Sequence, residues 1–300
     1  MKSYAKSGRS DHSAAISVAG DQGSGGAGTD AVQKIERLGI VSYSNVAPLH
    51  WRLEPWPEAE FVSGVPTELN AKLLDGTIDL TLISSIEFLR HRHLLKALPD
   101  FSVATLGPVY SVMLFHWRPW RELAGSQIAV TTHSATGTEL LRILLETSGI
   151  EAGFVPMPPR LDDMLASCEA ALLIGDTALV EAVMGRGIGG RKPLVTDLGE
   201  AWFNLTKLPF TFAVWASRRD TPPSERLVAK LRSAREEGLG HLADVAHKES
   251  TKLGLSPAVV QRYLGNFRYY LEPPDRDGLT TYGRMCLPGF APEEVGFWQM

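Results

Sequence analysis

The sequence predicts an α/β protein of two lobes with a hinged ligand cleft between them. From residue 36 onward, short apolar runs typical of buried strands alternate with segments of helical periodicity, which favours mainly parallel sheets covered by helices on both faces. The alternation occurs twice, in series of about 90 residues each, a length that suits one lobe apiece. Two further apolar runs, Ser111–Trp117 and Phe210–Ala216, bracket the second series. We expect them to be the two crossings between the lobes.

The first series contains three predicted strands and one clear helix. The strands are Arg37–Ser42, Glu60–Ser63 and Ile78–Ile83. The helix, Pro66–Asp75, places three leucines on one face and is stopped by Gly76. The first strand ends in a predicted loop, residues 43–48, and the third runs directly into residues 84–89.

The second series predicts a further set of strands and helices. Its strands are Gln127–Thr131, Phe154–Pro156, Ala170–Ile174 and Leu194–Thr196, and its helices are Thr138–Ser148, Leu161–Ser167 and Thr177–Met184. A loop, residues 132–137, separates the first strand from the first helix, and from Pro223 onward the chain is mostly helical. Lobe one is therefore expected to comprise residues 36–115 plus 214–300, and lobe two residues 116–213.

The first 35 residues differ from the rest and predict a disordered tail. Gly and Ser supply 12 of the first 30 positions, and the charges there are scattered. A secretory signal needs an apolar run of about 7–15 residues, whereas the nearest candidate, residues 14–19, is short and interrupted by Ser17. We therefore expect the protein to be cytoplasmic.

Composition excludes several classes of function. The chain has 34 acidic and 30 basic residues and a formal net charge of −4, so no basic field predicts binding to nucleic acid or an anionic membrane. No apolar run approaches the 18 or so residues of a membrane span. Cys168 and Cys286 lack the spacing of a zinc site or disulfide framework and are expected to be packed thiols. No nucleotide or metal motif occurs, so no cofactor is predicted.

Polar residues gather where predicted strands give way to helices, which is where ligands bind in α/β sheets. The four junctions are Ser44-Asn45, Ser84-Ser85, Thr132–Thr136 and Gly175-Asp176. Hydroxyl groups and unpaired N–H groups at helix starts suit a small organic acid, and Ser111 at the edge of the crossing strand would face the same gap. Each Ser, Thr or Asp is also an ordinary helix cap when taken alone, and Asn45 before Pro48 would equally shape a turn.

The histidines provide alternatives. His133 lies in one of the junctions and is a candidate acid or base, although a loop or supporting role is the simpler interpretation. His91 and His93 stand in a basic run that is expected to be solvated instead of metal-binding. His116, on the crossing strand, is expected to be packed or hydrogen-bonded.

Six segments, taken in order and spacing, resemble the chorismate dehydratase family of the futalosine route to menaquinone. They are VSYSNVAPL (41–49), GTIDLTLISSIEFL (76–89), GPVYSVMLF (107–115), TTHSATGTELLRILLE (131–146), ALLIGDTAL (171–179) and LPFTFAVWA (208–216). The resemblance covers residue 36 to the C-terminus. It implies a two-lobed, periplasmic-binding-protein-like fold of type II that works in the cytoplasm on a small dicarboxylate, chorismate.

The same resemblance implies a reaction and roles for particular residues. Chorismate would lose water to give 3-[(1-carboxyvinyl)oxy]benzoate, with the substrate's own enolpyruvyl carboxylate accepting the proton. Asn45 matches the family's asparagine and would orient the substrate and assist the departing hydroxyl. Four hydroxyl residues would hold the two carboxylates, and a carboxylate would fix the cleft or contact a substrate hydroxyl. These residues are Ser84, Ser111, Ser134 and Thr136, followed by Asp176.

Two departures and two alternatives accompany the resemblance. Ser44 stands where the family commonly has a bulky apolar residue, and Gly137 where a serine is common. One alternative is the sister enzyme that makes 1,4-dihydroxy-6-naphthoate with a second-lobe histidine, but this chain has Leu173-Ile174-Gly175-Asp176 there. The other is a non-catalytic binding protein for an organic anion, which would be an exported receptor or a sensor carrying a DNA-binding domain.

Overall fold

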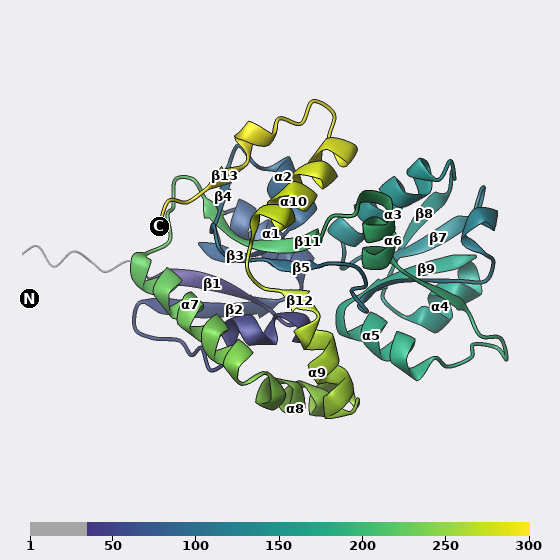
Figure 1. Ribbon diagram of the computed structural model, residues 1–300, viewed down its shortest axis with the longest axis horizontal. Coiled ribbons are helices and arrows are strands. Elements are labelled where there is room, and N and C mark those ends of the chain that lie inside the picture. The colour runs from purple at the N-terminus through teal and green to yellow at the C-terminus, as the bar shows by residue number, and fades with distance from the viewer. Residues whose placement is uncertain (1–34) are drawn as a thin grey trace, which may run out of the picture. The chain divides into compact units, whose positions relative to one another are not determined.

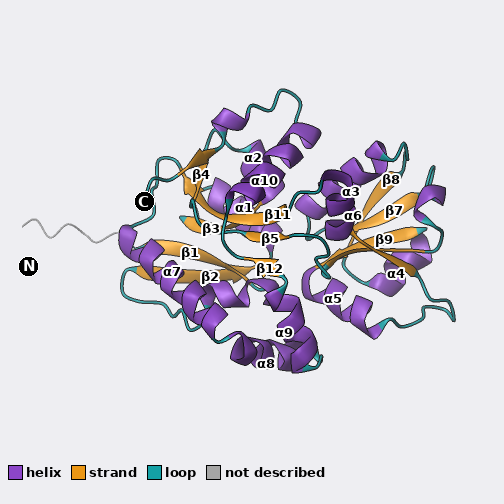
Figure 2. Ribbon diagram, in the orientation of Figure 1, coloured by secondary structure: helices purple, strands orange, loops and turns teal. Residues whose placement is uncertain are grey.

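Figure 1 shows a computed structural model of the protein, which describes residues 35–300. These residues form two β-sheets, each flanked by helices (Figures 1 and 2), and the predicted two-lobed α/β fold is confirmed. The predicted tail, residues 1–35, lies outside the described residues apart from Ile35. Within residues 35–300 no helix combines the length and the apolar character that a membrane span requires.

The larger sheet is built from eight strands of the described chain. They are β1 (Glu36–Val41), β2 (Ala59–Gly64), β3 (Leu80–Ser84), β4 (Leu95–Ala97), β5 (Val103–Thr105), β11 (Phe210–Arg218), β12 (Phe267–Arg268) and β13 (Gly296–Phe297). Six of them follow the order β12-β5-β11-β3-β1-β2, and β4 links β11 to β13. β1 is parallel to β2 and β3, whereas β11 is antiparallel to β3. The apolar strand near residue 210 thus pairs with strands far earlier in the chain.

The smaller sheet has five strands. They are β6 (Val112–His116), β7 (Gln127–Thr131), β8 (Gly153–Met157), β9 (Ala170–Ile174) and β10 (Leu194–Asp197), in the order β10-β6-β9-β7-β8. β7 is parallel to β8 and β9, and β6 is antiparallel to β9 and β10. The parallel strands of both sheets therefore deliver their carboxyl ends to helix starts.

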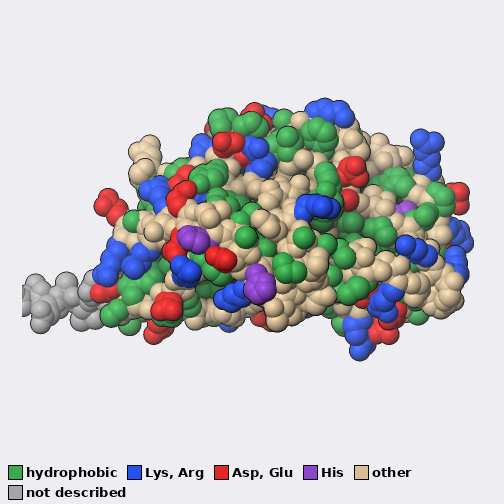
Figure 3. Space-filling model, turned by 60° about the horizontal axis from the view of Figure 1, so that its bottom comes forward, with side chains coloured by type: hydrophobic (Ala, Val, Ile, Leu, Met, Phe, Trp, Pro, Cys, Tyr) green, Lys and Arg blue, Asp and Glu red, His purple; other side chains and the backbone are tan. Residues whose placement is uncertain are grey.

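Helices connect and cover the sheets. They are α1 (Pro66–Leu74), α2 (Ser85–Arg90), α3 (Thr136–Thr147), α4 (Leu161–Ser167), α5 (Gly175–Met184), α6 (Leu198–Thr206), α7 (Glu225–Gly240), α8 (Leu242–Leu253), α9 (Pro257–Gly265) and α10 (Pro273–Cys286), with short 3-10 helices η1 (Ser44–His50), η2 (Trp120–Glu122) and η3 (Pro292–Glu294). Over the face shown in Figure 3, acidic and basic side chains are interspersed instead of forming a region of one sign.

The strand pairing corrects where the chain crosses between sheets. The sequence placed the crossings inside the strands 111–117 and 210–216, with lobe boundaries after residues 115 and 213. Those boundaries cut β6 and β11, whose paired residues all belong to one sheet each. The chain instead crosses in the segments before these strands, at 106–111 and 207–209.

Several local predictions also change. The loop at 43–48 is the 3-10 helix η1, and α3 and α5 begin at Thr136 and Gly175, two residues earlier than predicted. The predicted starts were late because the Thr, Gly and Asp residues there are also typical of loops, although they occupy the first turns of α3 and α5. The strands β4, β5, β12 and β13 were missed because runs of two or three residues carry no periodicity.

Candidate functional site

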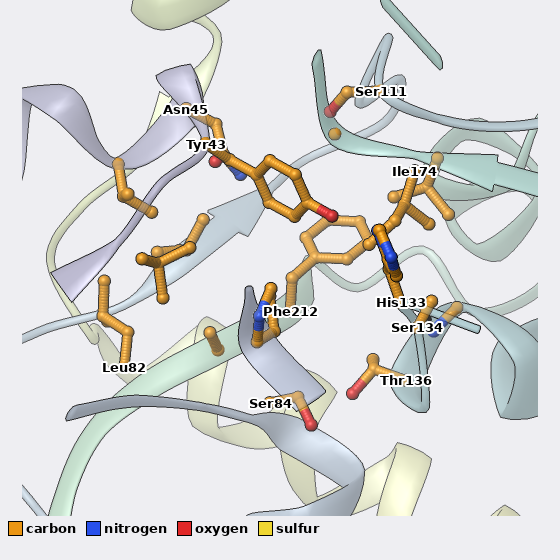
Figure 4. A pocket seen from close by; sticks show the side chains of 18 of the residues that line it. Tyr43, Asn45, Leu82, Ser84, Ser111, His133, Ser134, Thr136, Ile174 and Phe212 are labelled. Carbon is orange, nitrogen blue, oxygen red and sulfur yellow. Dashed lines mark hydrogen bonds between the residues drawn. The ribbon is translucent and has the colours of Figure 1, made fainter. Parts of the chain in front are cut away.

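A cavity lies between the two sheets, and five of the six predicted site residues line it. They are Asn45, Ser84, Ser111, Ser134 and Thr136. Figure 4 shows these side chains coming from both sheets' connections and facing a common space, with Leu82, Ile174 and Phe212 as apolar wall. Among the described lining residues there is no Lys, Arg, Asp or Glu. The cavity therefore offers neutral hydrogen-bonding groups on an apolar background.

Asn45 lines this cavity and carries a buried polar atom without a partner among residues 35–300. Its Oδ1 is buried and makes no hydrogen bond with residues 35–300. Its backbone carbonyl accepts a hydrogen bond from the Tyr269 hydroxyl at 2.9 Å, which helps to fix η1. α7 also packs closely on η1, since a Cβ at Gly238 would overlap the carbonyl oxygen of Pro48. A fixed backbone thus carries an amide whose oxygen is left without a hydrogen-bond partner among the described residues.

Three cavity hydroxyls share one hydrogen-bonding pattern. Each oxygen accepts a bond from a protein N–H, and none of the three donates to another described residue. The pairs are Ser84 Oγ with Asn70 Nδ2 (3.0 Å), Ser134 Oγ with Gly137 N (2.9 Å) and Thr136 Oγ1 with Ile86 N (3.1 Å). A hydroxyl has one proton to donate, so three protons remain for a ligand. Such donors suit an anion, because hydrogen bonds to a charged acceptor are stronger than neutral ones.

Ser111 is arranged differently. It is buried immediately before β6, and its Oγ donates a long hydrogen bond, 3.4 Å, to the carbonyl oxygen of Val109. Its own carbonyl accepts from the backbone N–H of Gly175 at 2.7 Å. Ser111 therefore ties the crossing segment to the start of α5 as well as lining the cavity.

Asp176, the sixth predicted site residue, does not line the cavity, and protein groups engage its carboxylate. Its Oδ1 accepts from Ser44 N at 2.9 Å, and its Oδ2 lies 3.2 Å from Ser44 Oγ and 2.8 Å from Lys252 Nζ. The Ser44 hydroxyl also lies 2.7 Å from Glu249 Oε2. Asp176 follows the smaller sheet's strand β9, whereas Ser44 follows β1 of the larger sheet. Its carboxylate is thus occupied in a contact between the two sheets' helices.

The structure adds three polar lining residues that the sequence reasoning missed: Tyr43, Thr67 and Asn70. Tyr43 directs its hydroxyl into the cavity (Figure 4), and burial, with a smaller contribution from Asp176, raises the pKa of Tyr43 to about 12. It is therefore a neutral phenol near pH 7. Asn70, on α1, is buried and bonded to Ser84. Its signal was present in the sequence, because Asn70 lies three residues before Leu73 on the predicted apolar face.

His133 was set aside for its loop position, yet the structure places it in the cavity wall. Its ring makes no hydrogen bond with the described residues, so nothing in residues 35–300 fixes its tautomer. His116 is buried as predicted, with Nδ1 2.6 Å from the carbonyl oxygen of Arg118 and Nε2 2.9 Å from Thr196 Oγ1. Burial lowers the pKa of His116. Cys168 and Cys286 are both free and partly buried.

Solved structures support the fold. A protein from Archaeoglobus fulgidus aligns with a TM-score of 0.62 at 21% identity, covering 85% of this chain and 97% of that one. The periplasmic aliphatic sulphonate-binding protein of Escherichia coli aligns with a TM-score of 0.61 at 16% identity, covering 89% and 92%. At these identities the likeness concerns the fold, which is that of periplasmic binding proteins.

Sequence comparison identifies the family. A family profile described as menaquinone biosynthesis matches residues 36–287. The chain is 44% identical over 270 residues to the chorismate dehydratase of Thermus thermophilus, covering 85% of this chain and 96% of the relative. It is 23% identical over 267 residues to the chorismate dehydratase of Campylobacter jejuni, covering 84% and 95%. The chain therefore belongs to the chorismate dehydratase family of menaquinone biosynthesis.

Proposed function

We propose that this protein is a chorismate dehydratase, a hydro-lyase that converts chorismate to 3-[(1-carboxyvinyl)oxy]benzoate and water. The observation that carries the proposal is the group of three cavity hydroxyls with unused protons beside the unpartnered Asn45 amide oxygen. The name of the Thermus thermophilus relative supports the same substrate. The cytoplasmic location, and a small molecule as partner with neither nucleic acid nor membrane, belong to this proposal.

The two carboxylates of chorismate would be bound by neutral donors. Ser84 projects from the larger sheet's side, and Ser134 and Thr136 project from the loop and first turn of α3. The starts of α3 and α5 also border the cavity, and the positive end of a helix dipole favours an anion there. Ser111 completes this set of substrate-binding hydroxyls. Neutral donors hold a dianion without burying fixed counter-charges.

The elimination itself asks little of protein acid–base groups. The C4–O bond breaks and the C3–H bonding electrons form the last double bond of an aromatic ring, while the proton leaves C3. The step is redox-neutral and driven by aromatisation, so we invoke no cofactor. Catalysis then consists mainly of holding the substrate in a reactive geometry. We assign proton acceptance to the substrate's own enolpyruvyl carboxylate.

Asn45 is assigned to the departing hydroxyl. An amide can donate and accept hydrogen bonds at once but is no general base at neutral pH. The buried, unpartnered Oδ1 of Asn45 is costly to leave unsatisfied, and a substrate hydroxyl would satisfy it. Asn45 would thereby orient the substrate while its NH₂ group stabilises the leaving oxygen. Asp176, outside the cavity, is assigned to holding the closed cleft.

The test is incubation of the purified protein with chorismate, followed by mass and ultraviolet detection. We expect an aromatic product lighter by one water, and slower formation with Ser134→Ala. Ser167→Ala is a matched control, because that hydroxyl bonds its own helix α4 at the carbonyl of Asp163. Unchanged chorismate would refute the proposal and favour the sister enzyme, for which His133 is in place, or an anion-binding protein.

A further inference from the structure

We infer that Asn70 is a positioning residue, which turns the Ser84 hydroxyl into a hydrogen-bond donor aimed at the cavity. This inference rests on the proposed function, because the acceptor it supplies is a substrate carboxylate. Asn70 lies on α1, 14 residues before Ser84, and its side chain reaches the end of β3. Neither the sequence pattern nor the family resemblance gave it a role.

The Asn70 amide engages Ser84 at two atoms. Ser84 N donates to Asn70 Oδ1 at 3.3 Å, and Asn70 Nδ2 donates to Ser84 Oγ at 3.0 Å. A backbone N–H can only donate, so the Asn70 atom facing it must be the carbonyl oxygen. The other atom is then the NH₂ group, which has no capacity to accept. The direction of both bonds is therefore determined by the backbone of Ser84.

That direction determines where the Ser84 proton points. Because Oγ receives a proton from Asn70, its own proton is directed elsewhere, and Ser84 donates to no other residue within 35–300. Ser84 lines the cavity, where a carboxylate is a suitable acceptor. Without the hydrogen bond from Asn70, the Ser84 hydroxyl could rotate about its Cβ–Oγ bond, and its proton would no longer be directed into the cavity. Asn70 thus orients the Ser84 hydroxyl before substrate binds, which lowers the entropy cost of binding a carboxylate there.

The position of Asn70 favours this role over a general one in stability. Asn70 is 4% exposed, on a helix whose neighbouring Leu69 and Leu73 are fully buried, and burying an amide costs free energy unless it is hydrogen-bonded. Both of its bonds go to one residue, a cavity serine. The polar side chain is therefore explained by what it does to Ser84.

The decisive variant is Asn70→Asp, assayed with chorismate between pH 5.5 and 8. Burial at this 4% exposed position is expected to raise the pKa of the introduced carboxyl from its ordinary value of about 3.9 into this range, and titration of the variant's carboxyl by NMR checks that it does. A protonated carboxyl group reproduces the amide, since its O–H donates to Ser84 Oγ while its C=O accepts from Ser84 N. An ionised carboxylate can only accept hydrogen bonds, so the Ser84 hydroxyl would donate to it instead of to the substrate. We expect KM for chorismate near the wild-type value at pH 5.5 and about tenfold higher or more at pH 8, with kcat changed much less. Asn70→Ala should raise KM by a similar factor at all pH values.

Repulsion between the introduced carboxylate and the substrate would also depend on pH, so the experiment is repeated in the Ser84→Ala background. The inference predicts that the pH dependence largely disappears there, because the hydroxyl that mediates it is gone. Persistence of the full dependence in that background, or an Asn70→Asp to wild-type ratio of KM that is constant with pH, would overturn it.

Failure of the proposed function is distinguishable from failure of this inference. Wild-type protein that leaves chorismate unchanged refutes the dehydratase, and thermal unfolding then decides the role of Asn70 without any ligand. Asn70→Ala and Ser84→Ala should each lower the unfolding midpoint by about 2–4 °C. Because they share one hydrogen bond, the double variant should lose less than the sum. Additive losses would overturn the inference.

Discussion

Asp176 provides the sharpest quantitative prediction, because its carboxylate joins two parts of the fold on either side of the cavity. Asp176→Ala removes the hydrogen bond from the Ser44 N–H and an ion pair with Lys252. The Ser44 hydroxyl has one proton, and it keeps the nearer acceptor Glu249 at 2.7 Å. A hydrogen bond to a charged group contributes about 1.5–3 kcal/mol. The ion pair adds at most about 1 kcal/mol, since the Lys252 side chain is 49% exposed. The contact between Asp176 and Ser44 joins the connections of the two sheets, so we expect it to favour a closed cleft.

We therefore expect the closed state to lose about 2–3 kcal/mol. If substrate is held in the closed state, its apparent affinity falls with the population of that state, by about thirtyfold to 160-fold. The effect should appear in KM for chorismate, with kcat reduced much less, because Asp176 does not line the cavity. Steady-state kinetics with mass detection of the product measures both constants.

Asp162→Ala is the matched control for this change. Asp162 also pairs with a basic side chain, Arg186, but both lie on connections of the smaller sheet and are exposed. Its KM should stay within about twofold of the wild-type value. An unchanged KM in Asp176→Ala would refute the closure argument. A fall in kcat at constant KM would show instead that Asp176 acts on the reacting atoms.

Three other substitutions test separate parts of the account. Asn45→Ala should lower kcat by about a hundredfold or more while weakening product binding far less, measured by turnover and product titration; equal losses would reduce Asn45 to a binding group. His133→Ala should retain most of the turnover, and a collapse of turnover with folding intact would identify a protein base. Burial, the largest cause, lowers the pKa of His50 from its ordinary 6.5 to about 4. Because the unfolded chain binds the proton more tightly, stability should be full above pH 7 and fall by up to about 3 kcal/mol as pH drops to 4. His50→Leu should flatten that acid limb in urea unfolding, and an unchanged limb would contradict the assignment.

The two departures from the family pattern have structural reasons. Ser44 is fully buried, yet its hydroxyl is satisfied by Asp176 and Glu249, so a polar residue replaces apolar packing at this contact. At Gly137 a Cβ would lie 2.7 Å from Ser134 Oγ. A serine there would displace the hydroxyl that Gly137 N now binds. Ser44 therefore fits its acceptors Asp176 and Glu249, and Gly137 leaves room for the Ser134 hydroxyl.

Periodicity was sufficient to predict most of the fold. Strands of four to six apolar residues and the leucine stripe of α3 repeat often enough to be recognised, and their alternation specified two α/β lobes. The strands that pair with β11 could not be predicted from periodicity, because they are β3, β4 and β5, in a distant part of the chain. The crossing positions depend on those pairings, which explains why the predicted boundaries fell inside β6 and β11.

The site was predicted less completely, for a related reason. Strand-to-helix junctions located Asn45 and the hydroxyls, since the ends of parallel strands meet at one edge of a sheet. The same rule could not choose between the two roles expected of Asp176, because a junction residue can turn toward a neighbouring helix instead of the cavity. It also missed Asn70, which reaches the cavity from within a helix. The element that carries a residue can be predicted from local sequence, but the direction of its side chain depends on tertiary contacts.

The central claim is that the cavity hydroxyls hold the carboxylates of chorismate beside Asn45. A crystal structure of the Asn45→Ala variant soaked with chorismate tests it most directly. The account predicts the ligand between the two sheets, with its carboxylate oxygens within hydrogen-bonding distance of Ser84, Ser134 and Thr136. A ligand bound elsewhere, or one in the cavity whose carboxylates face away from these hydroxyls, would contradict it.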